Sequence, residues 1–391
     1  MRVLILGGGF AGLWSALSAA RARQEFGAGL EIVLVNDTPF HSIRVRNYEA
    51  DLSDTRVPLD EVLRPVGVKR IKAGVTAIDV VQRRVACGGE TVSYDRLIFA
   101  LGSRLARPPI PGLAEHGFDV DTYAGAVRLN AHIAALGKRA ASAVLVVGGG
   151  LTGIEAAAEM PGKLRAAGVE KPRVILADHA ARIGSDMGEG AVPVIEEALE
   201  SLGVERRGGV SVVAVDAAGV TLQGGERIAA DTVVWCAGMR AHPLAAQFPV
   251  ERDRVGRLPV EPTLKVKGLD AEFAAGDVAS FLIDGTHSCV MSCQHGRPMG
   301  RFAGHNAVCD LLGKPMLPLE IGWYTTILDL GPWGALYTEG WNRNLVSTGA
   351  AAKKTKETIN RQRIYPPRSG DRLALLDAAA PTVQTPQVRF D

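Results

Sequence analysis

The chain has 391 residues, of which 47% are hydrophobic and 22% are charged, a balance that excludes a disordered chain and is typical of a globular protein with a buried core. The 44 basic and 42 acidic side chains leave a net charge of +2, so no strong field favours nucleic acid as a partner. Five cysteines, an odd number in a long chain, argue against a disulfide scaffold and favour a reducing, cytoplasmic location.

A glycine-rich loop follows directly on an apolar strand at the N-terminus. Residues 2–6 (RVLIL) are short and continuously apolar, as expected of a buried parallel strand. The loop GGGFAG (7–12) comes next, and a helix and a second strand (31–35) follow it. Such a loop is a weak signal alone, but inside a strand–loop–helix–strand frame it predicts a dinucleotide site.

Each residue of this loop has a physical task in such a site. Gly7 makes the tight turn, Gly9 lets a pyrophosphate approach the backbone, and Gly12 lets the helix pack closely on the strand. Phe10 and Ala11 open the helix, whose free N–H groups and positive dipole end would face the phosphates.

The same frame occurs a second time. An apolar strand at 143–147 (AVLVV) leads into GGGLTG (148–153), a helix, and a strand at 173–177 (RVILA). The residues that correspond to the first loop, with the hydroxyl beside them, are Gly148, Gly150, Thr152 and Gly153. The repeat predicts two dinucleotide sites; a second unit of this kind without a ligand is the alternative.

The residue that ends the second strand of each frame reads the adenosine ribose. In the second frame it is Asp178, whose carboxylate accepts hydrogen bonds from the ribose hydroxyls and repels a 2′-phosphate, so NADH is favoured over NADPH. In the first frame the position holds Asn36, followed by Asp37. Asparagine can also bond a ribose but is less diagnostic.

Further motifs follow in a fixed order. They are YDRLIFALGS (94–103), GGGLTGIEAAAE (148–159), TVVWCAG (232–238), EFAAGDVA (272–279) and Gln294 twelve residues before Asn306. With the two glycine loops, they make residues 2–310 resemble the type II NADH dehydrogenases and their apoptosis-inducing-factor-like relatives among the FAD-dependent pyridine nucleotide oxidoreductases. Leu101 and Cys293 depart from the Thr and Ala that this family carries.

The resemblance implies an α/β fold with two Rossmann-like dinucleotide-binding domains, the FAD domain being split by an inserted NAD(P)H domain, plus a small C-terminal α+β region. We expect the FAD domain at 1–110 and 260–315, the NAD(P)H domain at 111–259, and the C-terminal region, which would shape the acceptor pocket, at 316–391.

The resemblance also implies the activity. FAD and NADH would be the cofactors, with NADPH less favoured; hydride would pass from NADH to flavin N5, and electrons would go on to a quinone or a similar small acceptor. Beyond the glycine loops, the positions assigned to cofactor binding are Asn36, Asp37, Arg44, Val75, Ala100, Gly102, Asp178, Ala237, Gly238, Gly276, Asp277 and Gln294.

Three side chains are candidates for a catalytic role. Glu155 would orient the nicotinamide, or else is an ordinary carboxylate favoured by the helix dipole. Glu159, one turn further, would contact the cofactor or the acceptor pocket, or else is a solvated helix residue. Gln294 matches the family's Ala-Gln motif, which approaches the flavin ring near the quinone pocket.

The cysteines narrow the chemistry. The first helix carries none, which excludes the thiol–disulfide exchange of related disulfide reductases. Cys289 and Cys293 would share one face if they lay on a helix; they are a redox pair or, more commonly, small buried residues. No cluster has the spacing of metal ligands, so no metal is expected.

The C-terminal region combines aromatic and basic segments. Residues 318–341 contain three of the five tryptophans between glycines and prolines, which predicts short strands or turns. Residues 349–363 predict a polar, basic helix with a poor apolar face, hence weak or no membrane association, and no stretch reaches the ~18 apolar residues of a spanning helix. Its cations, either a solvated face or a docking patch, are Lys353, Lys354, Lys356, Arg361 and Arg363.

Two other functions stay open on the sequence. One is a soluble reductase of an electron-transfer protein such as a ferredoxin, which would need that basic patch. The other is a slow-turnover redox-sensing flavoprotein. A homodimer and a location in the cytoplasm, or peripherally at the inner face of the membrane, are further expectations.

Overall fold

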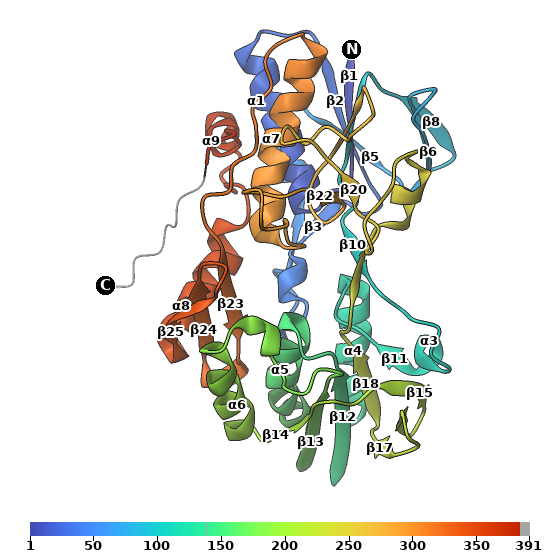
Figure 1. The fold of residues 1–391 in the computed structure, drawn as a ribbon, viewed down its shortest axis with the longest axis vertical. Helices are drawn as coiled ribbons and strands as arrows, with labels where there is room; N and C mark the ends of the chain where they lie inside the picture. The colour runs from blue at the N-terminus through green and yellow to red at the C-terminus, as the bar shows by residue number, and fades with distance from the viewer. Residues whose placement is uncertain (138, 384–391) are drawn as a thin grey trace.

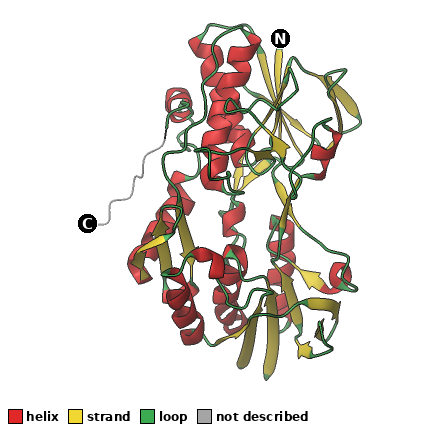
Figure 2. Cartoon of the chain, in the orientation of Figure 1, coloured by secondary structure: helices red, strands yellow, loops and turns green. Residues whose placement is uncertain are grey.

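The computed structural model describes residues 1–137 and 139–383. Figure 1 shows two regions one above the other, each built around a parallel sheet, and a third region of strands and helices beside them near the C-terminus. Figure 2 shows the same alternation of sheet and covering helices in both main regions. The predicted α/β fold with two Rossmann-like units is confirmed.

The first sheet contains the N-terminal strand at its centre. Its order is β21-β9-β1-β2-β5, with all neighbours parallel. The bounds are β1 Arg2–Leu6, β2 Glu31–Asn36, β5 Lys69–Lys72, β9 Arg96–Phe99 and β21 Glu272–Ala274. Residues 3–6 are completely buried, as their unbroken apolar run predicts.

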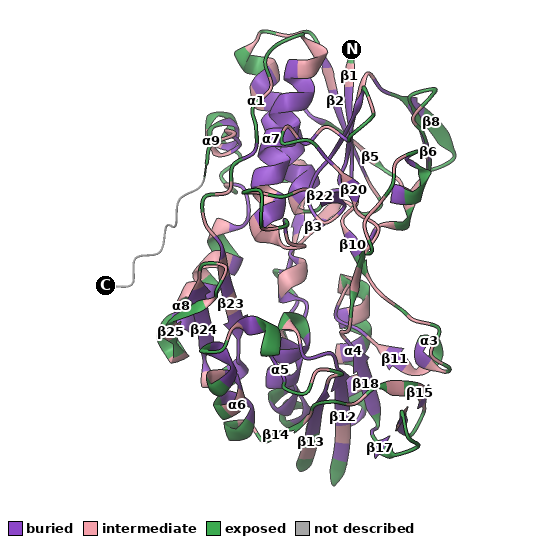
Figure 3. Cartoon of the chain, viewed as in Figure 1, coloured by how far each residue is buried: buried purple, intermediate pink, exposed green. Residues whose placement is uncertain are grey.

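Two long helices cover this sheet and pack tightly on each other. They are α1 (Phe10–Glu25) and α7 (Cys293–Leu311). Figure 3 shows both largely buried. Glycines on α7 permit the close approach, because a Cβ on Gly300 would overlap the backbone of Ala11 and a Cβ on Gly304 that of Ser15. The last third of the chain is thereby fixed to the first glycine loop.

The second sheet has the order β11-β18-β12-β13-β14, again parallel throughout. Its strands are β11 Gly117–Phe118, β12 Ala141–Val147, β13 Lys171–Ala177, β14 Val204–Arg207 and β18 Thr232–Trp235. The helices of this region are α3 Leu113–His116, α4 Tyr123–Ala135, α5 Leu151–Ala167 and α6 Ala191–Ser201.

The chain passes between the two sheets along one antiparallel pair of strands. β10 (Ser103–Leu105) runs out and β19 (Met239–Ala241) runs back, hydrogen-bonded together. Since β21 then joins the first sheet, that sheet is assembled from both sides of the insertion. This arrangement supports the division 1–110 and 260–315 around 111–259, whose boundaries stay a prediction.

Several small antiparallel and paired strands lie outside the two parallel sheets. Two antiparallel sheets are β6 Val75–Asp79, β7 Arg84–Cys87 and β8 Glu90–Ser93, and β15 Val212–Asp216, β16 Gly219–Leu222 and β17 Arg227–Ala229. The short pairs are β3 Phe40–Ser42 with β4 Arg56–Pro58, and β20 Leu258–Pro259 with β22 Ala279–Ser280; α2 spans Asp60–Leu63.

The C-terminal region is an antiparallel sheet followed by helices. Its elements are β23 Thr325–Asp329, β24 Ala335–Glu339, β25 Asn344–Thr348, α8 Gly349–Thr358, a π-helical turn at Ile359–Arg363, and α9 Arg372–Ala378. The short strands agree with the sequence prediction. The predicted helix over 349–363 is confirmed, and its last five residues widen into the π-helical turn. Among the described residues, no helix has both the length and the apolar character needed to cross a membrane.

Candidate functional site

The first glycine loop stands at the carboxyl end of β1, where parallel sheets bind their ligands. Gly7 has a φ of 103°, and a Cβ on Gly12 would overlap the carbonyl oxygen of Gly7. These two glycines are therefore required by the packing of the chain itself. Gly9 has an ordinary φ of −73°, and a Cβ there would meet nothing within 4 Å. Only Gly9 leaves room that a ligand would use.

The second loop repeats this geometry at the carboxyl end of β12. Gly148 has a φ of 115°, and a Cβ on Gly153 would overlap the Gly148 carbonyl oxygen. A Cβ on Gly150, like one on Gly9, would meet open space. Thr152 is exposed beside it at the start of α5. In each loop, therefore, two glycines are required by packing and the third leaves open space for a ligand.

The two residues that end the second strand of each frame hold the glycine loops. Asn36 Oδ1 accepts a hydrogen bond from the Gly8 N–H at 2.8 Å, and Asp178 Oδ2 accepts one from Gly149 N–H at 2.5 Å. Asp37 is exposed. His41, which sequence reasoning missed because an isolated histidine carries no pattern, bonds the Gly8 carbonyl through Nδ1 at 2.9 Å.

This equivalence allows a clean test of cofactor choice. Asp178→Asn removes the negative charge and retains an amide oxygen that can hold Gly149, as Asn36 holds Gly8. We expect the preference for NADH over NADPH to fall, because the repulsion of a 2′-phosphate disappears. The ratio of the two dissociation constants is the measurement. An unchanged ratio would contradict the assignment of Asp178.

Residues that follow the first loop much later in the sequence lie close to it in the structure. Gly276 has a φ of 77° and lies against Ala11, and Asp277 accepts a hydrogen bond from Ser103 Oγ at 2.5 Å. Burial raises the pKa of Asp277, against the lowering effect of Ser103. Arg44 pairs with Asp121 and donates to the Ser103 carbonyl at 3.1 Å. These expected flavin-side residues therefore form one connected group.

The remaining predicted cofactor positions are backbone sites. Ala100 lies against Gly7 and Gly102 has a φ of 70°. Ala237 lies against Gly148, and Gly238 has a φ of 81°. Val75 opens β6 and is only partly buried, with no contact that defines its role.

A cavity of about 330 Å³ lies among α5, α7 and the C-terminal region. Its walls combine aromatic and apolar side chains with a few charges. The residues that line it include Arg44, Tyr48, Thr152, Glu155, Cys293, Gln294, Arg297, Glu320, Trp323, Tyr324, Ile327, Lys356, Arg363 and Ile364. Such a lining suits a flat, mostly apolar molecule with a few polar groups.

Gln294 is fixed at one wall of this cavity. Its amide pairs with the backbone of Thr325, donating to the carbonyl oxygen at 3.0 Å and accepting from the N–H at 3.0 Å. It therefore joins the first turn of α7 to β23, and the predicted flavin-side motif meets the C-terminal region here.

Glu155 forms a buried ion pair with Lys356. The Glu155 side chain is 8% exposed and that of Lys356 is 6% exposed. The same carboxylate accepts a hydrogen bond from the Asp329 N–H at 3.1 Å, and Lys356 also donates to the Ile327 carbonyl at 3.1 Å. Burial raises the pKa of Glu155, and Lys356 opposes the rise. Glu155 is therefore not an ordinary solvated first-turn carboxylate.

A second set of contacts leads from this pair toward the surface. Lys353 pairs with Asp329 at 2.6 Å and with Glu159 at 3.9 Å. Tyr48 donates its hydroxyl to Asp329 at 3.2 Å. Glu159 is partly buried, which raises its pKa. Glu159 thus lies one turn from Glu155 in the same network, rather than as a solvated residue.

These contacts correct the interpretation of the basic segment. Lys353 and Lys356 point into the protein against carboxylates, and Arg361 pairs with Glu49 and Asp54. Lys354 is the exposed lysine of the run. The run is therefore neither a solvated face nor a five-cation docking patch. Sequence reasoning missed this because the partners of Lys356 lie 201 and 29 residues away along the chain.

The two cysteines near Gln294 do not share a helix face. Cys289 lies before α7, whose N-cap is Ser292, and its thiol donates to the Ala279 carbonyl at 3.3 Å. Cys293 is the first residue of α7 and lines the cavity. Both are free thiols whose pKa burial raises. The condition for a helical redox pair is thus not met.

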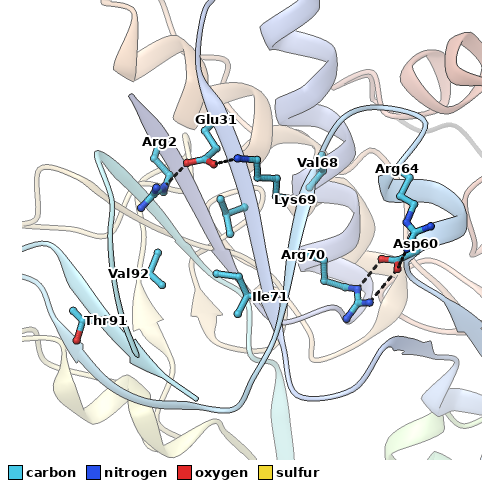
Figure 4. Close-up of a pocket in the computed structure, with 11 residues that line it drawn as sticks. Arg2, Glu31, Asp60, Arg64, Val68, Lys69, Arg70, Ile71, Thr91 and Val92 are labelled. Atoms are coloured by element: carbon cyan, nitrogen blue, oxygen red, sulfur yellow. Dashed lines mark hydrogen bonds and ion pairs between the residues drawn. The ribbon is translucent and has the colours of Figure 1, made fainter. Parts of the chain in front are cut away.

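A second hollow, of about 660 Å³, lies on the opposite edge of the first sheet (Figure 4). Arg2, Glu31 and Lys69 open β1, β2 and β5, so this is the amino edge of the strands. Its charges are already paired, Glu31 with both neighbours at 2.6 Å. Since parallel sheets bind their ligands at the carboxyl edge, we place the functional site at the glycine loops and the cavity.

Comparison with known proteins identifies the family of the chain. An NADH dehydrogenase-like protein of Mycobacterium tuberculosis is 58% identical over 98% of this chain and 99% of its own length. The demethylphylloquinone reductase of Synechocystis is 29% identical over 86% of each chain. The solved structure of NDH2 from Plasmodium falciparum, in complex with NADH, covers 96% of this chain and 97% of its own with a TM-score of 0.76 at 13% identity, a likeness of fold. Residues 1–300 match the pyridine nucleotide-disulphide oxidoreductases, and the chain belongs to this family.

Proposed function

We propose that the protein is an FAD-dependent NADH dehydrogenase of the type II class, which passes electrons from NADH to a quinone or a similar small acceptor. One observation carries this proposal: two dinucleotide loops of closely similar geometry stand at the carboxyl ends of two parallel sheets, and an aromatic-lined cavity lies next to elements of both.

The residues present fit FAD at the first loop. Gly9 leaves a cradle that a Cβ would fill, and the start of α1 points free N–H groups at it. Asp277 and Arg44 are linked to this loop through Ser103 and Gly276. When bound, the flavin supplies the capacity to accept a hydride from NADH and to give up electrons to an acceptor. The protein holds and orients it.

The residues present fit NADH at the second loop. Gly150 repeats the open cradle of Gly9, and Asp178 supplies the acidic side chain at the strand end. Glu155 lies in the first half of α5, directly behind the loop, and lines the cavity. We assign it the orientation of the nicotinamide end, with Glu159 supporting the carboxylate network behind it.

The cavity fits a quinone-like acceptor. Trp323, Tyr324 and Ile327 offer flat and apolar surfaces, while Gln294, Glu155 and Lys356 offer hydrogen bonds. Reduction of a quinone consumes protons as well as electrons, and Lys356 and Glu155 are groups that carry protons at the cavity wall. The name of the Synechocystis relative, a quinone reductase, supports the same class of acceptor.

A protein acceptor such as a ferredoxin has less support. It needs an exposed basic patch, and two of the lysines offered for it are occupied by buried or half-buried carboxylates. No contact among the described residues specifically supports a slow redox-sensing role or a homodimer. We place the protein in the cytoplasm, where a lipid-soluble quinone would be met peripherally at the inner face of the membrane.

An anaerobic titration with NADH tests the proposal. We expect the FAD-loaded protein to lose its flavin absorbance near ~450 nm within the mixing time and to recover it on addition of a naphthoquinone. NADPH should act much more slowly, because Asp178 repels its 2′-phosphate. A protein that stays yellow with NADH would contradict the assignment of the second loop as an NADH site. A protein that is bleached by NADH but not reoxidised by any quinone would contradict the assignment of a quinone as the acceptor.

A further inference from the structure

Two arginines on α7, Arg297 at the cavity wall and Arg301 one turn further on, have no acidic partner in the part of the chain that the structure describes. The guanidinium carbon of Arg301 lies 4.2 Å from the ring centre of Trp14, and that of Arg297 lies 5.3 Å from the same ring. Arg301 is only 6% exposed. Among the described residues, neither guanidinium has a hydrogen bond or an ion pair to any carboxylate.

The polar atoms of this group are all donors. Nε of Arg297, Nε of Arg301 and Nε1 of Trp14 are buried and have no acceptor among the described residues. Arginine and the indole carry no acceptor atoms, so the three side chains cannot satisfy one another. A buried donor without an acceptor, and still more a buried unpaired charge, is costly. The group therefore lacks what an oxyanion would supply.

The electrostatic consequences point the same way. Burial lowers the pKa of Arg297. Burial and the neighbouring charge of Arg297 lower the pKa of Arg301 to about 9. An anion placed between them would remove the repulsion and restore both guanidiniums.

The group opens onto the cavity already described. Arg297 lines the cavity, and so does Arg363, which likewise has no hydrogen-bond or ion-pair partner in the described part of the chain. The carboxylate of Glu320 also lines it, but this residue is exposed and pairs with neither arginine. Glu155, the cavity's buried carboxylate, is already held by Lys356.

We propose that Arg297, backed by Arg301 on Trp14 and joined by Arg363, forms a recognition site for a carboxylate or another oxyanion on the small molecule that occupies the cavity. The preferred ligand is then an acidic aromatic compound, a quinone that carries a carboxylate being the corresponding acceptor. This inference rests on the proposed function for the identity of the cavity as the acceptor site. It adds a charge requirement that a neutral quinone does not meet.

A pair of non-reducible probes tests the charge requirement. 2-Naphthoate and 2-naphthamide have the same ring system and similar size, and differ in charge. We would titrate the FAD-loaded protein with each in a calorimeter, so that no turnover is needed. We expect 2-naphthoate to bind about tenfold or more tightly, as charge-assisted hydrogen bonds imply. Equal affinities would overturn the proposal.

Variants locate the effect. Arg297→Gln should abolish most of the preference for 2-naphthoate and leave the affinity for 2-naphthamide unchanged, whereas Arg297→Lys should retain part of it. The matched control is Arg361→Gln, whose guanidinium pairs with Glu49 and Asp54 and does not line the cavity. An equal loss in Arg361→Gln would show a diffuse field and overturn the site.

Lipid is the other source of an oxyanion. Sedimentation with phosphatidylglycerol vesicles, against phosphatidylcholine vesicles, separates the two sources. If Arg297→Gln loses vesicle binding but keeps its preference for 2-naphthoate, the arginines serve a headgroup and the proposal is wrong. A charge preference without any quinone turnover would contradict the proposed function alone. Quinone turnover without a charge preference would contradict this inference alone.

Discussion

Gly9→Val is expected to give a folded protein that does not retain FAD. A side chain at this position meets nothing within 4 Å in the protein, and the backbone φ of −73° suits any residue, so the variant should fold with a loss of at most about 1 kcal/mol from the helix N-cap. A bulky side chain would stand where the pyrophosphate must approach, and several charge-assisted hydrogen bonds would be lost. We expect FAD affinity to fall about a hundredfold or more, measured as flavin bound per protein after gel filtration.

The chain contains its own controls for this prediction. Gly150→Val makes the same change in the second loop, so it should keep the flavin but fail to bleach with NADH. Gly12→Ala should instead damage folding, because its Cβ would overlap the Gly7 carbonyl oxygen. A Gly9→Val protein that purifies with full flavin would contradict the assignment of the first loop. An unfolded Gly9→Val protein would contradict the distinction between access and packing.

The glycine loops could be read from the sequence because their chemistry is local. Turn, phosphate access and helix packing are encoded within six residues, and the strand that precedes each loop is an unbroken apolar run. The family resemblance implied that residues 260–315 belong with the first domain, and β21 does join the first sheet. The apolar run was enough to predict these strands, because strands of a parallel sheet are buried on both faces and contain mostly apolar residues.

The buried charged residues of the site could not be predicted from local sequence. Glu155 and Lys356 are 201 residues apart, and nothing in the composition of residues 349–363 distinguishes an inward lysine from a solvated one. The segment is polar on every side, so its inner face is defined by the carboxylates it meets. The same limit applied to Arg301, whose partner is the Trp14 ring on a helix near the other end of the chain.

Asn36 and Asp178 illustrate a third case. The sequence identified both residues, but not the hydrogen bond that each makes to its glycine loop. Both were chosen as ribose-reading positions from their place at a strand end. Each also holds an amide of the adjacent loop, at 2.8 Å and 2.5 Å. The position at a strand end does not reveal the bond to the loop, because the amide that donates it belongs to the loop; the ribose contact stays a prediction.

Lys356→Met is expected to have the largest effect on the acceptor reaction. It leaves the Glu155 carboxylate buried without a cation, a change that typically costs 3–5 kcal/mol when the charge remains. The pKa of Glu155 is already raised by burial and should rise further. Since its folded pKa then lies above the unfolded value, the folded form binds the proton more tightly. Stability should therefore fall as pH rises through and above the ordinary carboxyl range, more steeply than in the unaltered protein.

Lys356→Met should also separate the two half-reactions. Hydride transfer from NADH to the flavin takes no proton from this lysine, so bleaching should slow only as far as Glu155, without its partner, orients the nicotinamide less well. Reduction of the quinone takes up protons at the cavity wall, where Lys356 lies. We expect the reoxidation step to slow by about 10²–10⁴-fold, the usual contribution of a positioned proton donor, in a stopped-flow measurement of flavin recovery. Lys354→Met, an exposed position two residues away on α8, should behave like the unaltered protein.

The double variant Lys356→Met with Glu155→Gln distinguishes a catalytic pair from a structural one. With no charge left in the buried site, its unfolding free energy should recover most of the loss and its pH dependence should flatten. Reoxidation of the reduced flavin by quinone should stay slow, because neither side chain can then deliver a proton; this step is measured apart from bleaching, since Glu155 is also assigned to the nicotinamide end. If turnover returns together with stability, the ion pair only holds β23 and α8 against α5. The proton for the acceptor must in that case come from another group on the cavity wall.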